Sequence, residues 1–579
     1  NYKITSWLDV LGRVSYDGTF DFQEERKAVG SASSTTDQIG YTRFNRSYSE
    51  TNYDLLINFN KNITRDISFK GLIGGNMRRT RLSSIRATTN GGLVVPRLYA
   101  LSNSVSPINP PTEEFTRVGV DGIFANASFG FKEFIFLDLA ARQDKSTTLP
   151  TNNNSYFYPS VGTNFVFSNI LKTDWLTHGK LRANYAEVGN SAQELSLYDV
   201  YDKPTAFGSV PLFSLPNTKN NPMLKPERTK SFEAGIEAEF FKSRLGFDFT
   251  WYKTRSLDQI IPVGITAATG YTQRYVNSGE VENKGIEVSA FVLPVRTKDF
   301  TWRLSLNFTR NRNKVIYLYG TGENRVKNVL IASLQGGVSL NATEGSPYGV
   351  IKGTDFIYTN GQRTVLPSGY YDATATSDKI IGNPMPDWLG GINNAFTYKN
   401  VSLSFLVDMR QGGQIFSLDQ WYGEGTGLYP VTAGLNAKGI AKRLPVSQGG
   451  GVLLPGVKAD GSPNDIYAEN QDGNGQTAYG YAANGQKGTP RAMYVYDGSY
   501  VKLREVALTY SLPSSLMSKL RGIKGVDLSI IGRNLWIIHK NMPYSDPEES
   551  LSAGNANSGY QSGAYPNVRT YGFNVKLSF

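Results

Sequence analysis

The last nine residues of the chain alternate strictly between apolar and polar side chains. In steps of two, Phe573, Val575, Leu577 and Phe579 share one face of an extended segment. Asn574, Lys576 and Ser578 occupy the other face. A strand in the wall of a membrane barrel turns every second side chain to lipid and the others to a polar interior. This segment therefore predicts a transmembrane β-strand.

The same alternation recurs along the whole chain, which has no run of about 18 apolar residues that could form a membrane helix. Many alternating runs with long polar insertions between them predict an all-β fold, a transmembrane antiparallel β-barrel. A soluble β-sandwich is the alternative. Without linkers or repeats, residues 1–579 are expected to form one barrel domain. The clearest runs contain Leu55/Ile57/Phe59, Leu245/Phe247/Phe249/Trp251, Trp302/Leu304/Leu306/Phe308, Leu403/Phe405/Val407/Met409 and Val526/Leu528/Ile530.

Connections between the expected strands alternate between short and long, which predicts periplasmic turns and extracellular loops. The short ones are 131–133, 241–243, 293–299 and 399–400; the long ones are 190–228, 360–387, 412–499 and 535–570. Strand direction alternates consistently except between Asn313 and Pro347, where parity predicts one more strand. Arg325 to Leu334 is the candidate. The total is then about 18 strands.

Composition excludes several kinds of chemistry. There is no cysteine and there are only two histidines, so we expect no disulfide, no metal site and no cofactor. The net charge of +11 comes without a nucleic-acid-binding motif, so no nucleic-acid partner is expected. The basic cluster Arg78-Arg79-Thr80-Arg81 is interpreted as a solvated strand end. The alternative is that it binds anionic lipid headgroups.

No catalytic motif was found, so the chain is not expected to be an enzyme. The sequence from Gly473 to Ala478 loosely matches a dinucleotide loop, and Asp472 to Gly475 resembles part of a calcium loop, but both favour plain loop. The acidic run from Asp546 to Glu549 favours solvated loop charge over a carboxylate pair for hydrolysis. Trp421 and Tyr422, in the longest loop, could stack on a ligand or sit in an aromatic girdle at the membrane surface.

Several stretches are more specific than a generic barrel. They closely resemble the C-terminal part of SusC/RagA-type TonB-dependent outer-membrane transporters, in family order, over at least the last 360 residues or so. The stretches are NPMLKPERTKSFEAGIE (221–237), VNSGEVENKGIEV (276–288), EGSPYGVIKGTDF (344–356), NPMPDWLGGINNAFTYKNVSLSF (383–405), DGSYVKLREVALTYSLP (497–513), GRNLW (532–536) and YPNVRTYGFNVKLSF (565–579).

The resemblance implies an active importer of glycan fragments or oligopeptides in the outer membrane of a Gram-negative bacterium. It implies a 22-stranded barrel with an N-terminal plug and a TonB box, TonB as energy source, and a SusD-like surface lipoprotein as lid. Contacts with lipid and lipopolysaccharide and a dimer of SusC–SusD pairs are further expectations. Because the plug, the TonB box and about four strands are not found in this sequence, we expect them upstream.

The resemblance of the last strand to outer-membrane proteins generally also implies that Phe573, Val575, Leu577 and Phe579 form a membrane-insertion signal. Two alternatives to an importer remain open at this point. One is a SusC-like barrel that serves as a scaffold subunit of a larger outer-membrane machine. The other is an 18-stranded passive porin.

Overall fold

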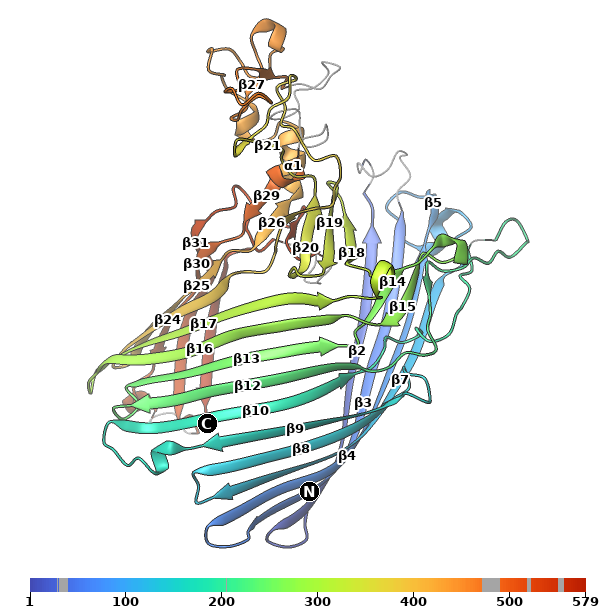
Figure 1. Cartoon of the computed structure of the whole chain (residues 1–579). Coiled ribbons are helices and arrows are strands. Elements are labelled where there is room, and N and C mark those ends of the chain that lie inside the picture. Colours follow the sequence, from blue (N-terminus) through green and yellow to red (C-terminus); the bar gives the residue numbers. More distant parts are fainter. Residues whose placement is uncertain (29, 31–39, 205, 471–489, 518–521, 550–556) are drawn as a thin grey trace. The chain divides into compact units, whose positions relative to one another are not determined.

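A computed structural model of the chain describes residues 1–28, 30, 40–204, 206–470, 490–517, 522–549 and 557–579 (Figure 1). Its elements are almost all strands, and 17 of them are assigned to one main sheet. Cα proximity divides the chain into two compact units. Each unit is described by itself.

Unit 1 contains residues 1–170, 181–233 and 254–280. Each strand of its wall pairs antiparallel with the next one along the chain. These strands are β1 (Tyr2–Lys3), β2 (Leu8–Arg26), β3 (Tyr41–Asn62), β4 (Ile67–Thr88), β7 (Thr112–Phe131), β8 (Ile135–Ser146), β9 (Ser155–Phe165) and the second half of β10 (Leu176–Asn190). Smaller strands between them are β5 (Asn90–Leu93), β6 (Ser104–Ser106), β11 (Thr218–Lys219), β14 (Ile260–Gly264) and β15 (Gln273–Asn277).

Unit 2 contains residues 171–180, 234–253 and 281–579. Six of its strands pair consecutively and antiparallel: β17 (Phe300–Tyr317), β24 (Trp388–Tyr398), β25 (Val401–Gln411), β30 (Tyr500–Ser511), β31 (Gly525–Lys540) and β33 (Thr570–Ser578). The main sheet also includes β12 (Glu227–Phe240), β13 (Leu245–Leu257) and β16 (Glu280–Arg296). The main sheet contains 17 described strands, whereas the sequence predicted about 18.

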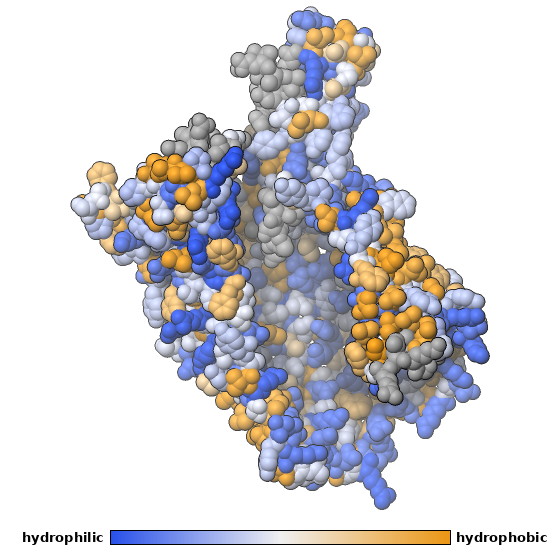
Figure 2. Space-filling model, turned by 180° about the vertical axis from the view of Figure 1, so that it is seen from behind, coloured by the Kyte–Doolittle hydropathy of each residue, from blue (hydrophilic) through white to orange (hydrophobic). Residues whose placement is uncertain are grey.

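The predicted two-residue alternation is present in both units. Phe573 of β33 lies opposite Ile530 of β31, and both side chains are well exposed. In unit 1 the exposed fraction of Ile123 is 73%, whereas its neighbour Gly122 is buried. Figure 2 shows apolar side chains gathered in patches between hydrophilic ones. The wall strands thus carry one apolar face and one polar face.

The short turns lie where they were predicted. Lys132 and Glu133 between β7 and β8, and Lys399 between β24 and β25, adopt positive φ angles of 47°, 58° and 50°. Such left-handed residues reverse the chain within a few positions. A hairpin turn and the next long connection necessarily lie at opposite ends of the strand they share. In both units the turns therefore occupy one end of the wall, which we call the turn end, and the long segments the other, the loop end.

The long segments of unit 2 contain elements of their own. These are β18 (Asn328–Leu334), β19 (Val338–Thr343), β20 (Tyr348–Gly353), β21 (Tyr358–Thr359), β22 (Gln362–Arg363), β23 (Lys379–Gly382), β26 (Gln414–Ser417), α1 (Leu418–Gly425), β27 (Val452–Leu453), β28 (Tyr467–Ala468), β29 (Val495–Asp497) and β32 (Tyr560–Gln561). At the turn end, α2 (Ser514–Met517) follows β30. No helix among the described residues is both long enough and apolar enough to cross a membrane.

The extra wall strand predicted between Asn313 and Pro347 is wrong. β17 pairs directly with β24, so the parity of the wall needs no further strand. The candidate segment does form β18, but in a separate four-stranded sheet with β19, β20 and β23. Its apolar residues Ile331 and Leu334 pack against a buried cluster of the loop segments instead of alternating on a wall face. The position of β18 is therefore determined by burial against other loops. The alternation of strand direction carries no information about such contacts.

Candidate functional site

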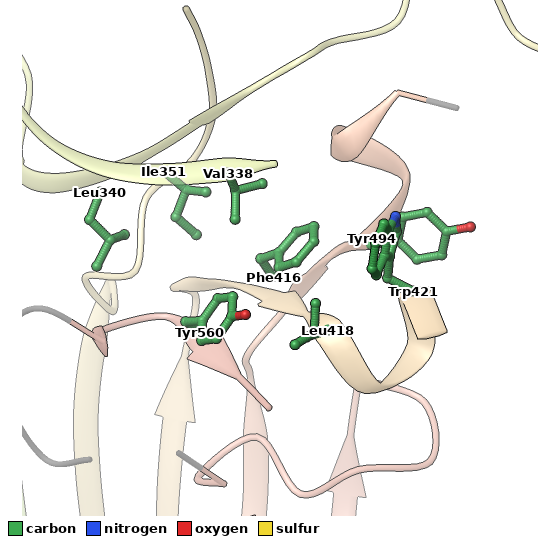
Figure 3. Close-up of a cluster of buried hydrophobic side chains, with 8 residues drawn as sticks. All are labelled: Val338, Leu340, Ile351, Phe416, Leu418, Trp421, Tyr494 and Tyr560. Atoms are coloured by element: carbon green, nitrogen blue, oxygen red, sulfur yellow. The ribbon is translucent and has the colours of Figure 1, made fainter. Parts of the chain in front are cut away.

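Three long segments at the loop end of unit 2 fold together into one structure. We call the described parts of 318–387, 412–499 and 541–569 the loop assembly. Its largest core takes side chains from all three segments: Val338, Leu340, Ile351, Phe416, Leu418, Trp421, Tyr494 and Tyr560 (Figure 3). Phe416 is fully buried and stacks on Tyr560, with ring centroids 5.9 Å apart and planes 12° apart. The loop assembly therefore has its own hydrophobic core outside the wall.

Hydrogen bonds hold the same segments in register around α1. Strand β26 pairs with β29 on one side and runs parallel to β32 on the other. Ser417 caps α1, because its Oγ accepts a bond of 3.2 Å from the Gln420 backbone N–H. The Ser417 hydroxyl in turn donates to Gln561 Oε1 at 2.5 Å. Residues about 140 positions apart are thus joined at the start of the helix.

Two glycines connect the wall to the loop assembly. Gly412 and Gly413 follow β25 with φ angles of 71° and 81°, a left-handed conformation that favours glycine. The Gly412 N–H donates to Ser499 Oγ at 2.8 Å, and the Gly498 N–H donates to the Gly413 carbonyl at 2.6 Å. A Cβ at Gly412 would collide with Asp387. This close crossing fixes the direction in which β26 leaves the wall.

A buried charge network ties the segment after β31 to the wall strand β30. Lys502 Nζ lies 2.5 Å from both Asp546 Oδ1 and Glu548 Oε2, and the Lys502 side chain is only 4% exposed. Arg504 donates to both carboxylate oxygens of Glu548 at 2.9 Å and also pairs with Asp408 of β25. Such bidentate, charge-assisted bonds are among the stronger polar contacts in proteins.

This network corrects the expectation for the acidic run from Asp546 to Glu549. Asp546 and Glu549 are buried, not solvated loop charges. Burial alone would raise the pKa of Glu548, but hydrogen bonds from Arg504 and Lys502 outweigh it and lower that pKa to about 2. Glu548 therefore stays ionised, because cations of the wall pair with it. The pairing of Asp546 and Glu548 with lysine and arginine favours a structural tie over an acid–base pair.

Trp421 and Tyr422 both lie in α1, inside the loop assembly. Trp421 is buried in the core, and the Arg491 guanidinium lies over its ring, 5.6 Å from the centroid. Tyr422 is half-buried, meets Trp421 edge to face at 4.6 Å, and accepts a hydrogen bond from the Gln335 side chain. Neither residue belongs to a wall strand. A ligand-stacking role for the pair stays a prediction, and Tyr422 is the more accessible of the two.

Three buried polar atoms in or beside α1 have no hydrogen-bond partner among the residues that the structure describes: Trp421 Nε1, Glu424 Oε2 and the Tyr494 hydroxyl. Burial raises the pKa of Glu424 to about 7. Burial, and then the charge of Glu424, also raise the pKa of Tyr494 well above its usual range. Burying a charged carboxylate is costly, so Glu424 favours its neutral form below about pH 7.

The other predicted features differ in how far the structure describes them. Phe573, Val575, Leu577 and Phe579 are all exposed on one face at the C-terminus, as their alternation predicts. Their role as an insertion signal stays a prediction. The dinucleotide-like and calcium-like motifs between Asp472 and Ala478 lie outside the described residues. No group of three or more potential metal ligands occurs in the part of the chain that the structure describes.

Lys502 and Arg504, the cations that hold the loop assembly, were not predicted from the sequence. A signal was present, since the two residues share one face of an expected strand and a run of three acids follows some forty residues later. The two-residue spacing shows that Lys502 and Arg504 share a strand face. It does not show which acidic residues pair with them across a long connection.

Comparison with known proteins places this architecture in a family. A family model described as "TonB dependent receptor-like, beta-barrel" matches residues 2–405, well over half of the chain. The chain belongs to this TonB-dependent receptor-like β-barrel family. The resemblance found in the sequence is therefore confirmed at the level of the family.

Individual relatives of this TonB-dependent receptor-like chain are distant. TonB-dependent receptor P3 of Formosa agariphila is 26% identical over 628 residues, covering 100% of the chain and 57% of that receptor. TonB-dependent receptor SusC of Bacteroides thetaiotaomicron is 26% identical over 324 residues, 50% of the chain and 31% of SusC. The structure of the RagAB peptide transporter matches with a TM-score of 0.75 and 20% sequence identity. The match covers 100% of this chain and 60% of the RagAB chain, and it shows a shared fold. The chain thus spans little more than half the length of P3.

Proposed function

We propose that the chain is the barrel portion of a SusC-like outer-membrane importer that takes up glycan fragments or oligopeptides. The observation that carries this proposal is a TonB-dependent receptor wall whose loop end supports a separately cored loop assembly, tied down by the buried Lys502 network. A passive pore needs only a wall. A separately packed structure at the outer opening fits a protein that binds cargo or a partner there.

In this proposal the work is physical and no covalent chemistry is involved. The wall forms a channel in the outer membrane, a plug fills it, and TonB supplies energy through the plug. The loop assembly holds part of the cargo and seats a SusD-like lipoprotein lid. Tyr422 is its candidate cargo contact. In addition, Phe573, Val575, Leu577 and Phe579 serve as the signal for barrel insertion.

Exposed apolar residues on the loop assembly support a partner at this end. Leu428 is 80% exposed and Leu435 65% exposed, although both lie in segments that follow the buried helix α1. Large apolar side chains left in water are typical of interaction surfaces when they gather on one structure. They offer a lipoprotein lid apolar anchors beside the opening.

The test is uptake by the full-length transporter, expressed with its own surface lipoprotein. Cells should import labelled oligopeptides or oligosaccharides only when TonB is present. Uptake that does not need TonB would support a passive pore, and stable assembly without any uptake would support a scaffold subunit.

The lid is tested by a double substitution, Leu428→Asp with Leu435→Asp, which should reduce co-purification of the lipoprotein. The control is Leu516→Asp, the same substitution at another exposed leucine, which lies in α2 at the turn end and is 47% exposed. Equal recovery of the lipoprotein with both proteins would contradict the proposed seat.

A further inference from the structure

The four-stranded sheet of the loop assembly ends in a strand with a free edge. The strand order is β18, β19, β20 and β23, so β18 pairs with β19 on one side only (Figure 1). Among the residues that the structure describes, no backbone hydrogen bond joins the other edge of β18 to a further segment. Successive residues of a strand direct their N–H and C=O groups alternately to its two edges. The free edge of β18 therefore presents a row of unpaired backbone groups.

β18 carries few of the features that usually prevent a free edge from pairing with another chain. Such edges are commonly guarded by lysine, by proline or by being very short. β18 is seven residues long, its sequence NVLIASL contains no charge and no proline, and valine and isoleucine favour strands. A shift in register between Leu330 and Ala332 is its one irregularity. By contrast β23, at the other end of the same sheet, has four residues and begins with Lys379.

One face of β18 is anchored and the other is open. Val329 and Ile331 pack against a buried cluster beside the wall, and Ile331 and Leu334 pack against the core drawn in Figure 3. On the opposite face the side chain of Leu330 is 50% exposed, and Ser333 is exposed as well. The edge is thus held in strand geometry before anything binds to it, which lowers the entropy cost of pairing.

The C-terminal end of β18 lies beside Tyr422. Gln335, the next residue along the chain, donates from its side chain to the Tyr422 hydroxyl, and its carbonyl accepts a bond of 3.0 Å from the Tyr560 hydroxyl. Gly336 follows with a φ angle of 92°, and a Cβ there would meet the Phe416 ring at 2.8 Å. These contacts fix the free edge and the candidate cargo contact Tyr422 next to each other in one structure.

We propose that the free edge of β18 binds an extended oligopeptide as an added strand, with Tyr422 near one end of the bound chain. This inference rests on the proposed importer and narrows its cargo from glycans or peptides to peptides. An extended polypeptide presents N–H and C=O groups at the spacing of a strand edge, and a glycan has no such row of groups. Main-chain pairing also allows peptides of many sequences to bind, because it reads no side chain.

Hydrogen exchange of the purified full-length transporter tests the site. A pool of capped, uncharged peptides of about ten residues should slow exchange at residues 328–334 roughly tenfold or more, because amides of the free edge gain partners. β23 is the control within the same sheet and should exchange as it does without peptide. Neutral oligosaccharides of similar mass should give no protection at β18.

The backbone pairing is tested on the ligand. A peptide from the pool is made with N-methylalanine at four adjacent central positions, which removes N–H groups from both of its edges. Its affinity should fall about 25-fold, roughly fivefold for each of two lost hydrogen bonds. The matched control carries 2-aminobutyrate at the same positions. This isomer of N-methylalanine keeps its N–H, so the control should bind as the alanine peptide does.

The edge is tested on the protein by Leu330→Lys with Ser333→Lys. Peptide binding should weaken severalfold, because a docked strand would remove water from the two ammonium groups. The matched control is Leu366→Lys with Ser368→Lys, which alters an exposed leucine and an exposed serine in a turn of the loop assembly. The control should bind peptide as the unaltered protein does.

Several results would overturn the proposal. They are absence of peptide binding, peptide binding without protection at residues 328–334, equal protection by oligosaccharides, equal affinity of the N-methylated peptide, and equal binding by the two double variants. Protection of β18 by the surface lipoprotein alone would make that protein the occupant and would also reject the peptide site. Binding is measured without TonB, so peptide import by a protein that shows no protection at β18 would reject this site and keep the proposed function.

Discussion

The wall strands and the loop assembly place their apolar side chains in opposite ways. In the wall, Ile123 and Phe573 are 73% and 69% exposed, whereas Phe416 and Tyr494 in the loop assembly are fully buried. A strand that keeps large apolar groups outside needs an apolar surrounding, while a buried aromatic cluster gains stability from leaving water. The chain thus uses two sequence patterns: one for a wall with an apolar surrounding and one for a loop assembly in water.

The largest test of this difference removes an aromatic ring from each region. Phe416→Ala should destabilise the loop assembly by about 3–5 kcal/mol, because it empties the centre of a packed core. Hydrogen exchange of residues 412–425 should accelerate strongly, while exchange in β30 and β31 stays slow. Phe573→Ala is the control, since its ring is exposed and its loss should leave the loop assembly unchanged. Equal effects of both substitutions on residues 412–425 would show that the assembly has no core of its own.

A second test addresses the tie between the two regions. Lys502→Met should cost about 3–5 kcal/mol, because it leaves Asp546 buried without its cation, whereas Glu548 keeps Arg504. The segment 541–549 should then become accessible to protease although the wall remains folded. Arg533→Met is the control, because the pair of Arg533 with Glu505 is exposed and should contribute only about 0.2–1 kcal/mol. Protection of 541–549 in the Lys502 variant would mean that apolar packing alone holds the loop assembly.

A third comparison lies within one wall strand, β13. Phe249→Arg should cost roughly 2–4 kcal/mol if Phe249 lies near the middle of a lipid bilayer. Thr250→Arg, one position away on the opposite face, should be tolerated much better. Folding yield in lipid vesicles, measured by heat-modified electrophoretic mobility, compares the two variants. Equal yields would contradict the assignment of faces.

The wall could be predicted from the sequence because its pattern is local. A strand between two solvents repeats every second residue, so the last nine residues alone indicated which side chains share a face, and the opposition of Phe573 and Ile530 agrees. The loop assembly follows no such period. Lys502 meets Asp546 44 residues away, and Ser417 meets Gln561 144 residues away. Those pairings depend on the path of long connections, so β18 was predicted in the wall and the acidic run was expected in solvent.

The smallest expected effect concerns the buried carboxyl of Glu424 in the loop assembly. Its pKa is about 7 in the folded protein, above the usual value near 4.5. The folded state therefore holds this proton more tightly than the unfolded state, so stability is greatest below pH 4.5 and falls as the pH rises toward 7. The loss should amount to roughly 1–3 kcal/mol. Glu424→Gln keeps the group neutral, and exchange at residues 418–425 should then differ much less between pH 5 and pH 8.

Two other carboxyls serve as controls for Glu424. Glu548 has a folded pKa of about 2, so its stabilising effect is lost only as the pH falls from about 4.5 toward 2, outside the tested window. Burial raises the pKa of Glu549, so Glu549 shares the sign of Glu424 and must be tested alongside it by Glu549→Gln. If Glu549→Gln alone removes the pH dependence, the orphaned site beside Trp421 and Tyr494 is not its source. If only Glu424→Gln removes the pH dependence, ionisation of the buried Glu424 destabilises the loop assembly at neutral pH. Wall carboxylates such as Asp408 differ in this respect, because Asp408 is paired with Arg504.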